Sequence, residues 1–167
     1  MHRLSSKSVS LDSSVVVDFH HCGSLDILER AFAGRLLMSD LVREELNRAA
    51  ILLPSAEIVA LTTDEDWKRF EQLLEGRPGL GSGECGAIVV AWARGAAVLT
   101  NDKLARNCAE DFGIPVAGAI GVMEYAVEAV LISANDAVRI LEEMIRAGAW
   151  ISDELVESFR QRMAELS

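Results

Sequence analysis

The stretch Ala96-Ala97-Val98-Leu99-Thr100-Asn101-Asp102 shows how this chain is built, because a short apolar run leads directly into an acid and then into a helical pattern. A nearly all-apolar run of this kind is typical of a strand that is buried on both faces of a parallel sheet. Asn101 and Asp102 can begin a helix over residues 103–112, which Gly113 ends. The stretch therefore predicts a strand, a turn and a helix, with a carboxylate at the carboxyl end of the strand.

The same alternation extends through most of the chain. Strands are predicted over residues 14–18, 35–38, 56–61, 96–100 and 114–116. Helices are predicted over residues 25–32, 41–50, 64–74, 84–94 and 103–112, followed by three more over residues 120–131, 136–147 and 153–166. Strands that alternate with helices predict an α/β fold of three layers, in which helices cover both faces of a mostly parallel sheet of about five strands.

Length and composition indicate one globular domain. The chain has 167 residues, of which 50% are hydrophobic and 25% charged, and no repeat or linker divides it. We expect a single domain over residues 1–167, with a core over about 14–118 and a helical extension over about 119–166. The three cysteines form no CxxC pair and are expected to be free. No apolar leader or membrane-spanning run is apparent, which predicts a cytoplasmic protein.

The charge balance excludes one mode of nucleic-acid binding. The chain carries 16 Lys and Arg residues against 26 Asp and Glu residues, so its formal net charge is −10. A protein that binds nucleic acid through broad neutralisation of phosphates is usually basic. Any binding of a polyanion must therefore depend on a local site or on bound cations.

Four carboxylates are candidates for such a site. Asp18 is the last residue of the predicted first strand, Asp102 follows the fourth, and Glu45 and Glu84 lie in early turns of two helices. The carboxyl ends of parallel strands share one edge of the sheet, and ligands bind there. If the four acids meet, their repulsion favours a hard cation such as Mg²⁺ or Mn²⁺ among them. The pattern does not give the strand order, and a chain this acidic also places some carboxylates at strand ends by chance.

Together with the segments around them, these acids resemble those of a known family. The segments in question are residues 15–18, 42–46, 80–88, 98–106 and 113–118. In this order, and with Asp102 18 residues after Glu84, they make the chain resemble the PIN-domain nucleases, in particular the short prokaryotic PIN proteins of the toxin–antitoxin type. The resemblance extends over roughly residues 15–159.

The resemblance implies an activity, a cofactor and partners. It implies that Asp18, Glu45, Glu84 and Asp102 hold one or two divalent ions, Mg²⁺ or Mn²⁺, and that the protein is an endoribonuclease that cleaves RNA phosphodiesters. It also implies a homodimer and an antitoxin protein as a partner. Candidate substrate-binding residues near the acids are His20, Asn101, Lys103 and Arg106.

Two departures from the family pattern keep other functions open. Phe19 and His20 follow Asp18 where the family usually has a small hydroxyl or amide residue, and Asn101 stands where the subgroup often has an acid. A PIN-like binding module with a degenerate site is therefore one alternative. A phosphatase or phosphoacceptor domain that uses Asp18 as its nucleophile is another, although the sequence lacks the acid pair that such a domain needs.

Overall fold

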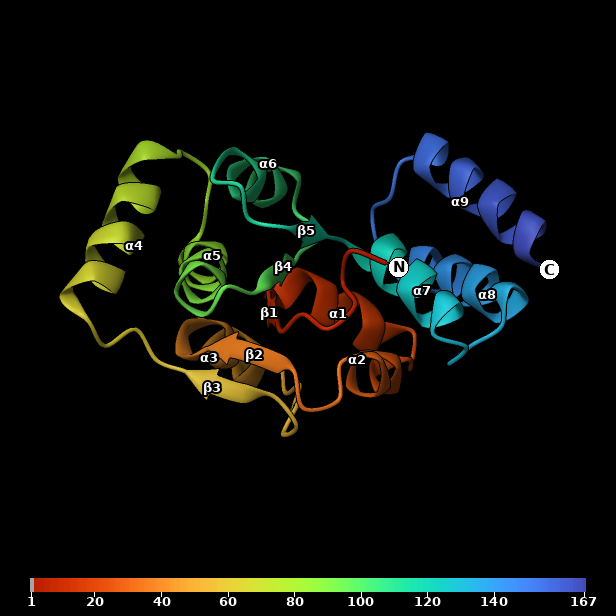
Figure 1. Cartoon of the computed structure of the whole chain (residues 1–167), viewed down its shortest axis with the longest axis horizontal. Coiled ribbons are helices and arrows are strands. Elements are labelled where there is room, and N and C mark those ends of the chain that lie inside the picture. Colours follow the sequence, from red (N-terminus) through yellow and green to blue (C-terminus); the bar gives the residue numbers. More distant parts are fainter. Residues whose placement is uncertain (1) are drawn as a thin grey trace.

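The computed structural model describes residues 2–167, and in them five strands form one parallel sheet (Figure 1). The strands are β1 (Val9–Leu11), β2 (Leu36–Ser39), β3 (Glu57–Val59), β4 (Ala97–Leu99) and β5 (Val116–Ala117). Their spatial order is β3-β2-β1-β4-β5, and every neighbouring pair is parallel. The chain order therefore reverses at β1, and β1 and β4 lie side by side at the centre.

Helices cover both faces of this sheet and extend beyond it. They are α1 (Ser13–His21), α2 (Leu25–Ala31), α3 (Asp40–Arg48), α4 (Asp64–Gly76), α5 (Ser82–Arg94), α6 (Lys103–Asp111), α7 (Ala119–Glu128), α8 (Ala134–Arg146) and α9 (Asp153–Leu166). Figure 1 shows α4 at one end of the molecule and α8 and α9 at the other. None of the helices in residues 2–167 combines the length and the apolar character needed to cross a membrane.

Alternate residues of the strands enter two separate cores. Leu36 and Met38 of β2 pack with α1, α2, α7 and α8, whereas Leu37 between them packs with α4, α5 and α6. In β4, Leu99 and Val98 divide in the same way. Because successive side chains of a strand point to opposite faces, one short strand contributes to both layers. The predicted α/β fold with a parallel sheet is confirmed.

The predicted first strand was wrong. Residues 14–18 lie in helix α1, and the first strand is Val9–Leu11 instead. Valine favours strands only where it packs well on a sheet, and tertiary packing overrides that preference. Here Val15, Val16 and Phe19 are spaced to face one side of a helix, and all three are fully buried in the core. Asp18 therefore lies inside a helix, and the residue that follows the first strand is Asp12.

Candidate active site

Asp12 lies at the carboxyl end of β1, directly before helix α1, and is only 1% exposed. Its Oδ2 accepts hydrogen bonds from the Thr100 hydroxyl at 2.6 Å and from the Ser14 hydroxyl at 2.8 Å. Its backbone N–H donates to the carbonyl oxygen of Leu99 at the end of β4. The other carboxylate oxygen, Oδ1, is buried and has no hydrogen-bond partner among the described residues. A buried acceptor without a donor is costly, so this oxygen is a natural ligand for a cation.

Glu45 approaches the same region from helix α3. The Ser13 hydroxyl donates to its Oε2 at 2.6 Å, which ties α3 to the start of α1. The Glu45 carboxylate also lies against Gly83 of α5, because a Cβ built on Gly83 would collide with Glu45 Oε1. No other residue fits there without moving Glu45. Gly83 thus leaves the space that allows this carboxylate to lie between two helices.

Glu84 lies in the first turn of α5, next to Gly83. Partial burial raises the pKa of Glu84, and the negative charges of Asp12 and Asp102 raise it further. Burial also raises the pKa of Asp12, against the hydrogen bonds from Thr100 and Ser14, and the charge of Glu45 adds to the increase. These mutual effects indicate that the four carboxylates act on one another electrostatically, although they come from four separate segments.

Asp102 follows β4 and caps helix α6. Its Oδ1 accepts a hydrogen bond from the backbone N–H of Ala105 at 2.8 Å, while its own N–H donates to the Thr100 hydroxyl at 3.1 Å. Thr100 is fully buried and contacts both Asp12 and Asp102. This hydroxyl therefore connects the carboxyl ends of the two central strands. The sequence-based placement of Asp102 at a strand end agrees with the structure.

The four carboxylates are neighbours, but their oxygens do not converge on one point as the ligands of a metal ion would. In residues 2–167 no group of three or more His, Cys, Asp or Glu side chains converges closely enough to hold a metal ion as placed. We refer to Asp12, Glu45, Glu84 and Asp102 as the acid cluster, because hydrogen bonds, close packing and the raised pKa values of two members connect them.

Asp18 lies beside this cluster rather than at a strand end. Its Oδ2 accepts a hydrogen bond from Asn101 Nδ2 at 2.6 Å, and Asn101 Oδ1 accepts from the backbone N–H of Ala119 at 2.8 Å. Asn101 thus connects α1, the end of β4 and the start of α7. Half-burial raises the pKa of Asp18, against the lowering effects of the Asn101 hydrogen bond and of the charge of His21.

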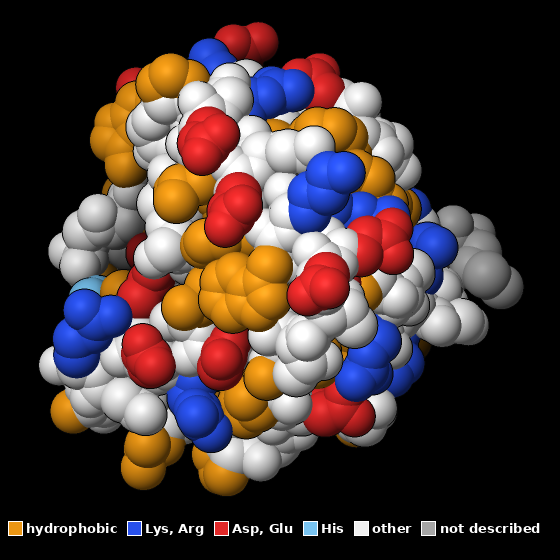
Figure 2. Space-filling view, turned by 90° about the vertical axis from the view of Figure 1, so that its left-hand side faces the viewer, with side chains coloured by type: hydrophobic (Ala, Val, Ile, Leu, Met, Phe, Trp, Pro, Cys, Tyr) orange, Lys and Arg blue, Asp and Glu red, His pale blue; other side chains and the backbone are white. Residues whose placement is uncertain are grey.

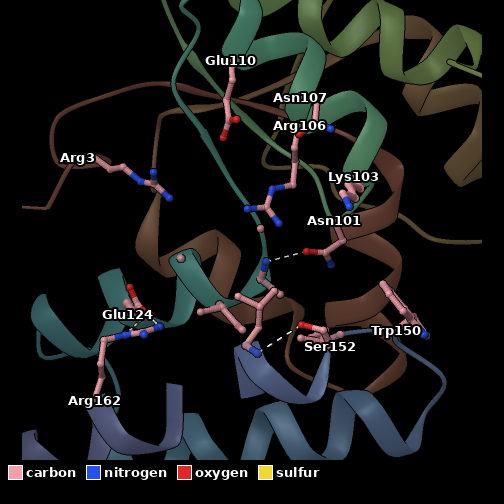
Figure 3. Close-up of a pocket in the computed structure, with 16 residues that line it drawn as sticks. Arg3, Asn101, Lys103, Arg106, Asn107, Glu110, Glu124, Trp150, Ser152 and Arg162 are labelled. Atoms are coloured by element: carbon pink, nitrogen blue, oxygen red, sulfur yellow. Dashed lines mark hydrogen bonds and ion pairs between the residues drawn. The ribbon is translucent and has the colours of Figure 1, made fainter. Parts of the chain in front are cut away.

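The three remaining candidates for substrate binding, His20, Lys103 and Arg106, are more exposed than Asp12. His20 is exposed near the end of α1, with its ring 6.0 Å from that of His21. Lys103 is exposed in the first turn of α6, and Arg106 lies one turn further along the same helix and is partly buried. Lys103 and Arg106 line a cavity that also includes Asn101 (Figure 3). His20 is not part of that lining.

Sequence reasoning missed Asp12 together with the hydroxyls of Ser13, Ser14 and Thr100. A signal was available, because Val9-Ser10-Leu11-Asp12-Ser13-Ser14 ends a short, half-apolar run with an acid and two hydroxyl residues. The hydroxyl residues that seemed to be missing after Asp18 follow Asp12 instead. The valine run just downstream is more apolar, and it led to the prediction of the first strand in the wrong segment.

Comparison with protein families matches this arrangement to one family. A family model described as a PIN domain matches residues 8–165, which include β1, Asp12, helices α1 to α8 and α9 up to its last residue but one. The chain belongs to the PIN-domain family. PIN domains are typically nucleases and typically depend on a metal ion. Comparison with curated proteins gives no match.

Proposed function

We propose that this PIN domain is a metal-dependent endoribonuclease whose metal-binding residues are Asp12, Glu45, Glu84 and Asp102. The observation that carries the proposal is the buried, unpartnered Oδ1 of Asp12, at the carboxyl end of the central strand and within electrostatic range of further carboxylates. In parallel α/β sheets, ligands bind at this edge. Asp12 takes the position that the sequence alone assigned to Asp18.

The donor set fits a hard divalent ion. Every candidate ligand in the acid cluster is a carboxylate oxygen, which is the ligand type preferred by Mg²⁺ and Mn²⁺ over softer metals. The bound ion would supply charge neutralisation at the phosphodiester and would make a bound water more acidic. It would also explain how a chain with a net charge of −10 binds RNA.

The residues of this chain would orient the carboxylates, and the hydrogen bonds to Asp12 oppose the rise that burial causes in its pKa. Thr100 and Ser14 fix one oxygen of Asp12 and leave the other directed away from them, and Ser13 fixes Glu45. Such hydroxyl partners hold ligand side chains in position, as supporting hydrogen bonds do in metal sites generally. A cation among the acids would reverse the raised pKa of Asp12 and of Glu84, because an opposite charge favours the ionised form.

The proposal extends to partners by family resemblance. We infer a cytoplasmic toxin that is held inactive by an antitoxin and that forms a homodimer. Exposed hydrophobic side chains offer contact area for such partners, among them Leu74 on α4 and Ile58 on β3. Figure 2 shows the face at the α4 end, where hydrophobic, acidic and basic side chains are interspersed. That face carries no continuous basic surface in this view, as expected of an acidic chain.

The deciding experiment is cleavage of a mixed-sequence RNA by the purified protein in Mg²⁺, in Mn²⁺ and in EDTA, beside Glu84→Gln. We expect cleavage that requires the metal and that falls by about 100-fold or more in the variant, since a lost ligand should affect activity at least as much as a lost supporting residue, which costs about 10–100-fold. Calorimetric titration with Mn²⁺ measures binding directly.

Two results would contradict the proposal. Cleavage that persists in EDTA would exclude the metal mechanism. An absence of both cleavage and saturable heat on metal titration would favour a PIN-like binding module with a degenerate site. The phosphoacceptor alternative assigned the nucleophile to Asp18 at a strand end, and Asp18 lies within α1.

A further inference from the structure

A cavity of about 500 Å³ opens beside Asn101 (Figure 3). Its walls come from the N-terminal segment, from α6, from the start of α7 and from the beginning and the middle of α9. Asn101, at the end of β4, forms part of the wall, and Asp102 of the acid cluster is the next residue along the chain. A ligand that fills the cavity would therefore contact the residue that directly precedes Asp102.

The cavity is cationic although the chain is acidic. Its lining includes the four cations Arg3, Lys103, Arg106 and Arg162, and two carboxylates, Glu110 and Glu124. The lining therefore carries a net positive charge, in a chain whose net charge is −10. In Figure 3 Arg3 and Arg106 extend from different segments toward the same central opening. A cavity with this charge favours a polyanion.

Most of these cations are not neutralised by the protein itself. Arg162 is paired with Glu124, its Nε donating to Oε1 at 2.9 Å. In residues 2–167 no ion pair involves Arg3, Lys103 or Arg106. The Nε of Arg106 is buried and has no hydrogen-bond partner there. A partly buried guanidinium without an acceptor indicates a ligand that supplies one, and phosphate oxygens suit its geometry.

An aromatic side chain at the rim adds a second kind of contact. Trp150 lines the cavity from the loop between α8 and α9 and is 85% exposed. Trp150 is the most exposed of the described tryptophans, and an indole ring beside a cationic cavity provides a surface on which a nucleic-acid base can stack. In a duplex the bases already stack on one another, so this contact requires a single-stranded segment.

We propose that this cavity is the subsite for single-stranded RNA that flanks the phosphodiester to be cleaved. Arg3, Lys103 and Arg106 bind its phosphates, one base stacks on Trp150, and Asn101 marks the boundary with the acid cluster. The ligand follows from the proposed ribonuclease function, but the subsite binds it through residues outside the acid cluster. Binding in this cavity therefore does not require a metal ion.

The test is binding of a fluorescently labelled single-stranded oligoribonucleotide, measured by anisotropy in EDTA over a series of salt concentrations. We expect Trp150→Leu to weaken binding by about fivefold or more, as loss of a stacked base does. Arg106→Ala and Lys103→Ala should each weaken it severalfold and flatten the plot of log K against log salt by about 0.7 per lost phosphate contact. A duplex of the same sequence should bind more weakly than the single strand.

Matched controls lie on α4, at the far end of the molecule in Figure 1. Trp67→Leu removes another exposed tryptophan, and Lys68→Ala removes another exposed lysine. Both should bind RNA within about twofold of the parent, since neither lines the cavity. Equal effects of the cavity and the control variants, or no saturable binding by the parent at low salt, would overturn the subsite.

Binding without a metal also separates this inference from the proposed activity. Loss of RNA binding in the cavity variants would support the subsite even if the protein cleaved no RNA. Metal-dependent cleavage with unchanged binding in all cavity variants would support the activity and refute the subsite.

Discussion

The acid cluster and the cationic cavity are neighbours at one edge of the sheet, but they are built in opposite ways. Asp12 is short, buried and held by hydroxyl groups, and Thr100 beside it is fully buried. Lys103 and Trp150, in contrast, are exposed to solvent. Asn101 joins the two regions, because its backbone N–H donates to the Ser14 hydroxyl beside Asp12 and its Oδ1 accepts from the backbone N–H of Ala119 in the cavity wall. Side chains that hold a metal ion need fixed positions. Side chains that contact a flexible RNA segment must instead be long and free to adjust.

The largest expected effect is on RNA cleavage, and it distinguishes Asp12 from Asp18 as the metal ligand. Asp12→Asn should lower metal-dependent RNA cleavage by about 100-fold or more, because it removes the charge of the proposed central ligand. Asp18→Asn should lower it by less than about tenfold, because the amide oxygen of the new side chain would still accept the hydrogen bond from Asn101. Initial rates of the two variants beside the parent, in Mn²⁺, measure the difference.

The reverse result would restore the sequence-based assignment. If Asp18→Asn lost cleavage while Asp12→Asn kept it, Asp18 would be the ligand, and α1 would have to turn its carboxylate toward the cluster. Circular dichroism and the Tm of both variants control for loss of fold.

The second expected effect concerns the space that Gly83 leaves for Glu45. Gly83→Ala should lower cleavage by about tenfold or more, because its Cβ would collide with Glu45 Oε1 and displace that carboxylate. Helix propensity alone would favour alanine by about 1 kcal/mol. The matched change Gly76→Ala, also in a helix but with no atom within 4 Å of the new Cβ, should leave cleavage unchanged. Equal activity of the two variants would show that Glu45 is not a positioned ligand.

These residues show what the sequence could and could not predict. The positions of Glu45, Glu84 and Asp102 in the fold could be predicted because helix caps and strand ends leave local signals, and the parallel sheet followed from the alternation of elements. Their role as metal ligands stays a prediction. Asp12 was missed because Val15 and Val16 were taken for the first strand. Their burial in the core as part of a helix outweighs their local preference for strands.

The cationic cavity was beyond sequence reasoning for a different reason. Arg3, Arg106 and Trp150 are far apart in the chain, and only the packing of α9 and α7 beside α6 brings them together. Lys103 and Arg106 were candidates because they share a helix face near Asp102. No local pattern connects them to Arg3 or to Trp150.

A third, smaller effect is a pH dependence of stability. Burial raises the pKa of Asp12 above its ordinary value of 3.8, so the folded state binds the proton more tightly than the unfolded state. The stability from this group is complete below pH 3.8 and is lost as the pH rises through the raised pKa. In EDTA, Asp12→Asn should therefore gain in Tm over the parent from acid to neutral pH, by a few degrees, since about 1 kcal/mol corresponds to about 2–4 °C. Melting curves at about pH 4 and about pH 7 measure this gain, and a constant difference would contradict the burial argument.

The smallest expected effect is found in the cavity, at the one cation of its described lining that the protein neutralises itself. Glu124→Gln should release Arg162 from its ion pair and strengthen RNA binding in EDTA by about two- to threefold, with a steeper dependence on salt. Stability should change by less than about 1 kcal/mol, because both side chains are partly exposed and such pairs contribute little. Glu143→Gln, which removes one ion pair of Arg139 on α8 outside the cavity, is the control and should leave RNA affinity unchanged. If both changes strengthened binding equally, the effect would come from the overall charge, and the cavity would not be a specific subsite.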